Sequence, residues 1–208
     1  MRFSVAVGIL FAVLASAGIG AGGVRVQLTP QDLQRATELA RWPHTDAERA
    51  QFHKRYTMAI NGPTVEYFAV ENIEVMTPFR RMELIAEEHA RINDLFARGG
   101  VRDAELALRP WRDQLSIVAR LRFDLTKLLP GVPDLEIALE GPNPVVPTST
   151  SSSRIEIAID NGNRTQLVGA LVEAVFDVQA VGQTKGPVVI RWNGKEIGRV
   201  AVDFAAME

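Results

Sequence analysis

Residues 115–123 read LSIVARLRF, and this stretch decides the class of fold that the sequence predicts. Its odd-numbered positions form an apolar face, whereas its even-numbered positions become progressively more polar toward Arg122. A period of two is typical of a strand that buries one side and exposes the other. The same alternation recurs at 135–140 and 154–160, so we expect three half-buried strands.

The exposed faces of these strands carry opposite charges, which can pair between neighbouring strands for about a few tenths of a kcal/mol each. The charged positions are Arg120, Arg122, Glu136, Glu140, Arg154 and Glu156. Residues 167–176 are apolar on both faces apart from Glu173, which predicts a strand covered on both sides. Asn-Gly steps at 161–162 and 193–194 predict two-residue hairpins.

The second hairpin also predicts its own register. A turn at residues 193–194 places Arg191 opposite Glu196 on one face and Ile190 opposite Ile197 on the other. Counting this hairpin, six strands follow residue 110 at short spacing and no helical pattern is found among them. This arrangement favours an antiparallel β-sandwich of immunoglobulin-like or related type.

The preceding part of the chain carries helix signals instead. Thr29 and Thr77 are each followed by proline, a cap and first-turn pair, and Thr45 to Glu48 is a capping box. The predicted helices cover residues 30–41, 45–56, 77–97 and 101–109, and one strand is predicted over 65–76. The fold class is therefore α+β, with a mainly helical region of residues 24–110 packed on a β-sandwich region of residues 111–208.

The segment 141–153, GPNPVVPTSTSSS, has little to bury because nine of its 13 residues are Pro, Ser or Thr. We expect it to be a mobile loop between two strands of one sandwich, and a linker between domains is the alternative. At the amino terminus, Arg2, the apolar run 5–15 and the small residues that follow form a secretory signal, cleaved after Ala17 or alternatively after Ala21. A buried helix over residues 5–15 is the competing interpretation.

Composition narrows the function. The chain of 208 residues has 23 basic and 25 acidic side chains, a net charge of −2, which disfavours a dedicated nucleic-acid binder. It contains no cysteine, so thiolate chemistry and disulfides are excluded, and an exported chain of this kind points to the bacterial periplasm. After the signal, no apolar run is long enough for a transmembrane anchor in the mature chain.

No catalytic constellation stands out. The histidines His44, His53 and His89 have no metal-ligand spacing, and no serine-nucleophile or phosphate-binding motif lies in a suitable context, so we expect no metal and no cofactor. His89 follows two glutamates but lies on the apolar stripe of its helix, where a core role is the commoner one. The catalytic residues are therefore left unassigned.

Two arginine pairs could bind an anion: Arg80 with Arg81, and Arg109 with Arg112. Acidic neighbours, among them Glu83, favour reading them as surface charges instead. Tryptophans 42, 111 and 192 are expected to seal the edges of the core.

These observations favour an exported, non-enzymatic envelope protein that acts as an interaction or structural module and has a protein or other envelope component as its partner. The alternative is a periplasmic hydrolase that uses carboxylates with His89 or His53. An enzyme should present a pocket where polar groups converge and a pKa is perturbed. A module should present an apolar patch or an open strand edge. The oligomeric state is not predicted.

Overall fold

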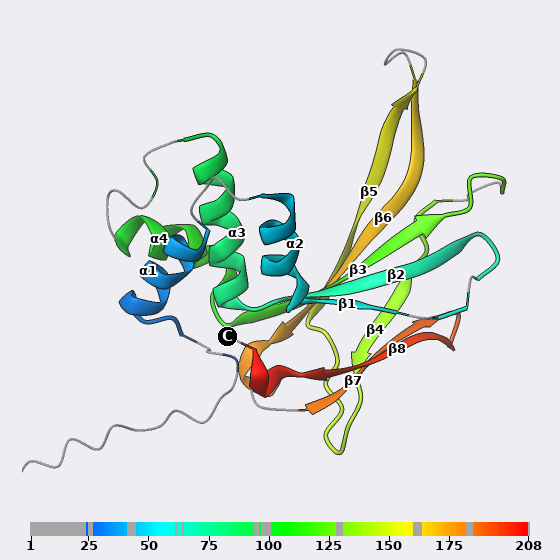
Figure 1. Ribbon diagram of the computed structural model, residues 1–208. Helices are drawn as coiled ribbons and strands as arrows, with labels where there is room; N and C mark the ends of the chain where they lie inside the picture. Colours follow the sequence, from blue (N-terminus) through cyan, green and yellow to red (C-terminus); the bar gives the residue numbers. More distant parts are fainter. Residues whose placement is uncertain are drawn as a thin grey trace, which may run out of the picture.

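The computed structural model describes residues 24, 27–40, 45–60, 62–63, 65–93, 96, 101–127, 131–159, 164–181 and 185–207. The signal sequence expected at residues 1–17 lies outside these ranges. The described chain forms helices and two antiparallel sheets, with four helices grouped on one side (Figure 1). The predicted α+β, sandwich-like class is confirmed, whereas the finer immunoglobulin-like detail is not.

Eight strands are found in the described residues. They are β1 (Thr57–Ala59), β2 (Phe68–Met76), β3 (Gln114–Phe123), β4 (Leu135–Leu139), β5 (Ser149–Ile159), β6 (Arg164–Asp177), β7 (Lys185–Trp192) and β8 (Lys195–Asp203). One sheet has the order β1-β2-β3-β6-β5 and the other has the order β4-β7-β8. The six strands expected after residue 110 are present. The preceding region contributes two strands rather than one, because the short β1 pairs with β2.

The apolar alternation of β3 builds the centre of the core. Its odd positions from Leu115 to Phe123 are all buried, and they belong to one cluster with Ile137 of β4 and Ile190 of β7. On the other side of β3, Arg122 is exposed and its Nε lies 2.9 Å from Glu71 Oε1. The predicted half-buried strand is confirmed.

The main helices are α1 (Pro30–Leu39), α2 (Asp46–Lys54), α3 (Pro78–Arg91) and α4 (Val101–Leu108), followed later by the short α5 (Val178–Val181). Each of the three predicted caps forms, with Thr29, Thr45 and Thr77 accepting a backbone hydrogen bond from the third helical residue. The apolar stripe of α3 packs with α1 in a second small core.

Helix α3 ends earlier than the sequence pattern predicts, at Arg91 instead of residue 97. Asn93 adopts φ 52°, a left-handed conformation that stops a helix and that asparagine tolerates better than most residues. Ile92, which the pattern places on the buried stripe, is therefore 64% exposed.

The second Asn-Gly hairpin forms as predicted at its turn, because Asn193 and Gly194 have φ values of 50° and 74°. Arg191 lies opposite Glu196, but Ile190 lies opposite Gly198 and not opposite Ile197. A bulge inserts Ile197 as an extra residue. Gly198 makes room there, since a Cβ on it would lie 2.9 Å from Ile60 Cγ2. The first Asn-Gly step lies outside the described residues.

The segment 141–153 is not one loop. Its last five residues, Ser149–Ser153, form the first half of β5 and pair with β6, Ser149 opposite Val175 and Ser153 opposite Leu171. The composition predicted a loop for these five residues and this was wrong, because an edge strand is held by backbone hydrogen bonds and needs no apolar side chains. The expectation for β6 also needs correction: Ala170, Val172 and its other inward residues are buried, but the opposite face is only half-buried.

Gly169 of β6 provides a test of how closely β3 and β6 approach. A Cβ added there would lie 2.4 Å from the backbone oxygen of Leu121, an atom that cannot swing aside. We expect Gly169→Ala to lower the free energy of unfolding by about 1–3 kcal/mol, measured by urea denaturation. The control is Gly141→Ala, where a Cβ meets nothing within 4 Å, with an expected change within about 0.5 kcal/mol. Equal effects of the two substitutions would contradict this packing.

Candidate functional site

A cluster of charged side chains is buried where α3 meets α2 and β2. Arg80 is 1% exposed, Glu83 is fully buried and Glu87 is 4% exposed. The sequence interpretation placed Arg80 and Glu83 on a solvated helix surface, and this was wrong. Helix α3 is covered on two sides, by α1 on its apolar stripe and by α2 on the face that carries these charges.

Arg80 is the centre of this cluster. Its Nε and Nη2 donate to Glu74 Oε1 of β2 at 3.2 and 2.8 Å, and Nη2 also donates to Nδ1 of His53 on α2. The guanidinium carbon lies 4.8 Å from the ring centroid of Tyr56 and 5.3 Å from that of Phe52. One side chain therefore ties α2, α3 and β2 together.

The contact with Arg80 fixes the state of His53. A guanidinium has only donors, so Nδ1 of His53 must accept, and the neutral ring then carries its proton on Nε2. Burial, followed by the charge of Arg80, lowers the pKa of His53 and favours this neutral form. Nε2 lies 3.5 Å from Glu87 Oε2.

Each buried carboxylate of α3 has an arginine beside it. Glu83 Oε1 accepts from Arg55 Nη2 at 2.6 Å, and Glu87 Oε1 accepts from Arg49 Nε at 2.6 Å. Burial raises the pKa of Glu83, against the opposing effect of Arg55 and Arg80. With Glu74, the cluster holds three carboxylates and three guanidinium groups around a neutral imidazole. Such compensation suits a structural clamp better than a proton-transfer site.

Arg81, also expected on the surface, is 9% exposed and joins α3 to the larger sheet. It donates to Ser116 Oγ of β3 at 3.0 Å and to Glu173 Oε1 of β6 at 3.3 Å. Its guanidinium lies 3.9 Å from the Trp111 ring centroid, and burial lowers its pKa. Trp111 therefore packs on a charged anchor, whereas Trp192 packs against the edge of the larger core as expected.

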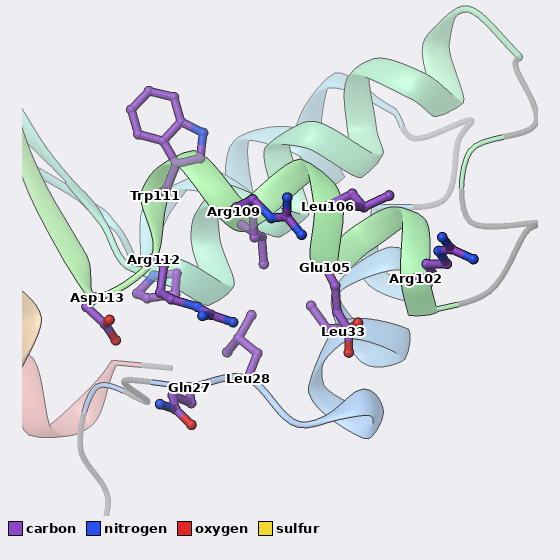
Figure 2. Close-up of a pocket in the computed structure, with 12 residues that line it drawn as sticks. Gln27, Leu28, Leu33, Arg102, Glu105, Leu106, Arg109, Trp111, Arg112 and Asp113 are labelled. Atoms are coloured by element: carbon purple, nitrogen blue, oxygen red, sulfur yellow. The ribbon is translucent and has the colours of Figure 1, made fainter.

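The second arginine pair lies at a cavity of about 440 Å³ beside α4. Arg109 and Arg112 line it, together with Arg102, which the sequence pattern did not single out, but Glu105 and Asp113 line it too. In Figure 2 Arg112 extends toward Leu28, whereas the Trp111 ring points away. Among the described residues that line the cavity, none is a histidine and none has a hydroxyl group.

Of the two remaining histidines, the structure describes His89. The His89 ring stacks on Phe96 with centroids 4.0 Å apart, and His44 lies outside the described residues, as does Trp42. Within the part of the chain that the structure describes, no three histidine or acidic side chains are grouped so as to hold a metal ion.

Strand β5 forms an open edge of the larger sheet. Among the described strands it pairs with β6 alone. Nine of its 11 residues are exposed, and Ile157 is 46% exposed. β6 pairs with β3 only from residue 169 onward, so its residues 164–168 and the end of β5 form a two-stranded ribbon, which projects from the molecule (Figure 1).

Two common protections of an edge strand against pairing, proline and lysine, are missing from β5. Its sequence, STSSSRIEIAI, contains no proline and no lysine. The one irregularity in its pairing with β6 places the extra residue, Val168, on β6, so β5 itself alternates regularly. The edge therefore presents a regular row of backbone donors and acceptors.

Comparison with known proteins gives little. No protein-family model matches the chain, and no curated protein matches it. A crystal structure of a protein of unknown function from Burkholderia pseudomallei K96243 is similar over 86% of this chain and 92% of that one, with 15% identity and a TM-score of 0.38. A similarity this weak carries no argument about function. Among the described helices, none has the length and apolar character needed to cross a membrane.

Sequence reasoning missed both the buried cluster and the full edge. The cluster did leave a signal, because Arg80, Glu83 and Glu87 follow spacings of three and four and so share one helix face. The first half of β5 left none, since Ser149–Ser153 have the composition of a loop.

The lowered pKa of His53 predicts a pH dependence of stability. Below pH 6.5, the ordinary pKa of histidine, the unfolded chain binds a proton at residue 53 more readily than the folded chain does. The stabilising contribution of neutral His53 is therefore complete above that pH and is lost as the pH falls through the folded-state pKa. In His53→Asn, whose amide oxygen can still accept from Arg80, we expect the free energy of unfolding to fall less between about pH 7 and about pH 5.

Urea denaturation at the two pH values measures this difference, and titrating carboxylates cancel because both proteins contain them. Identical pH dependence in the two proteins would show that the fold does not lower the pKa of His53.

Proposed function

We propose that this protein is an exported, non-enzymatic envelope module that binds an extended segment of a partner protein along the free edge of β5. The observation that carries the proposal is the open edge itself, with most of its residues exposed and with no proline or lysine to block it. Strand addition is a recurrent mode of recognition in which backbone hydrogen bonds supply affinity and alternate side chains supply specificity.

The composition of β5 supports this role. The serine and threonine side chains of its first half are short and leave the backbone there accessible. They also place few restrictions on the side chains of a partner strand. Its second half offers isoleucines at 155, 157 and 159, of which Ile157 is 46% exposed. A partner strand can therefore gain backbone bonds along one half and apolar contacts along the other.

A second candidate is the periplasmic hydrolase, and the contact of His53 with Glu87 is the observation that favours it. It is the weaker candidate for two reasons. The carboxylate of Glu87 is already engaged by Arg49. The cavity beside α4 is lined neither by His53 nor by Glu87.

Edge binding can be tested with Ile157→Lys. A lysine on the edge opposes strand addition, so partners captured from the native envelope on immobilised wild-type protein should bind this variant about tenfold more weakly, a loss of about 1.4 kcal/mol. The control is Leu106→Lys on α4, where the replaced side chain is similarly exposed, 48% against 46%. This control should bind normally.

Hydrogen exchange locates the contact. A captured partner should slow exchange of the β5 amides that do not face β6. A partner that binds but leaves β5 exchange unchanged, or that distinguishes neither lysine variant from wild type, would contradict edge binding.

Export has a separate test. We expect the protein in the periplasmic fraction of its host with an amino terminus at Gly18, or at Gly22 if the alternative cleavage site is used. Amino-terminal sequencing of the native protein measures this. A native chain that still begins at Met1 would rule out a cleaved signal.

A further inference from the structure

The charges of β5 are arranged so that the strand complements itself. Arg154 and Glu156 are two residues apart and so point to one face, with Ile155 between them on the other. Both charged side chains are exposed. No described residue forms an ion pair with either, so their charges are available to a neighbour along the free edge.

Two copies of one strand that pair antiparallel are related by a two-fold axis, which makes every contact occur twice. With the axis at Ile155, Arg154 of each copy lies opposite Glu156 of the other, and two attractive pairs form. Ile155 then lies opposite its own copy, with Ile157 at the adjacent diagonal position. The half-buried Ile155 and the exposed Ile157 are thereby gathered on one face.

Neighbouring registers lose this match. An axis at Arg154 or at Glu156 sets a charge directly opposite the same charge, which is destabilising. A shift of the register by one residue exchanges the two faces. It places Arg154 opposite Ile155 and Glu156 opposite Ser153 in one direction, or Arg154 opposite Ile157 and Glu156 opposite Ile155 in the other, so neither charge has an opposite charge across from it. Among registers centred on these three residues, only the one at Ile155 satisfies both the charges and the faces.

We infer that the occupant of the β5 edge is β5 of a second copy of this chain, paired antiparallel about Ile155 and joining the two five-stranded sheets into one. This inference rests on the proposed function and names its partner. The approach is accessible because, among the described strands, β5 pairs with β6 alone and the ribbon formed by the ends of β5 and β6 projects from the molecule (Figure 1).

Charge exchange tests the register. Sedimentation of the purified protein over a range of concentrations should reveal a dimer. Arg154→Glu and Glu156→Arg should each weaken it about tenfold or more, because both two-fold related pairs become repulsive. The double variant R154E/E156R restores opposite charges in both pairs and should recover the wild-type dissociation constant within about threefold.

Arg102→Glu is the matched control, since Arg102 is exposed on α4 and the charge change equals that of Arg154→Glu. It should leave dimerisation unchanged. A protein that is monomeric at every concentration, a dimer that both single variants leave intact, or a double variant no stronger than the single ones would each overturn the inference.

Failure of this inference differs from failure of the proposed function. A monomer whose β5 amides become protected when an envelope partner binds would overturn the self-pairing and retain edge binding. A dimer that forms with β5 amides unprotected would overturn the self-pairing alone, and the proposed function would fall as well only if a captured envelope partner also left these amides unprotected.

Discussion

Backbone pairing on the two sides of β3 is the constraint on which the rest of this protein depends. β3 pairs with β2 from Phe123 to Ser116 and with β6 from Gln114 to Arg122. β2 comes from the mainly helical region, so the first half of the chain is completed by a strand of the second half. The inward side chains of β3 also pack against the smaller sheet. Loss of this strand would therefore disrupt both sheets and remove the surface on which the helices pack.

The helices are fixed to that sheet through buried charge instead of apolar packing alone. Arg80 reaches Glu74 on β2, and Arg81 reaches Ser116 on β3 and Glu173 on β6. Removing such groups from water is expensive, so a compensated cluster adds less net stability than its contacts suggest. Its contribution lies in geometry: each guanidinium donates in fixed directions and therefore restricts how α3 can lie on the sheet.

Periodicity and local turn chemistry were the parts of this fold that the sequence could predict. The strand over residues 115–123, the threonine caps and the turn at Asn193 each depend on neighbouring residues, and each is found. The predictions were wrong where the local structure depends on residues that are distant in the sequence. Ser149–Ser153 form a strand because β6 lies alongside, Gly198 beside the bulge leaves room for Ile60, and the burial of Arg80 follows from where α2 packs.

The candidate site divides in the same way. The charges and alternation of residues 154–159 were visible, so an exposed strand with Arg154 and Glu156 was predictable. That this strand ends the sheet was not, because strand order depends on long-range pairing that no local pattern encodes.

The end of the ribbon has a consequence for how the molecule moves. Among the described strands, residues 156–159 of β5 and 164–168 of β6 are held only by each other, whereas the remainder of β6 is held on both sides. Opening the ribbon therefore breaks one ladder and exposes little of the core, so it costs far less than global unfolding. These residues of β5 and β6 should therefore open and close independently of the rest of the fold. A partner that binds them has to offset the conformational entropy lost when that motion stops, and this lowers its affinity.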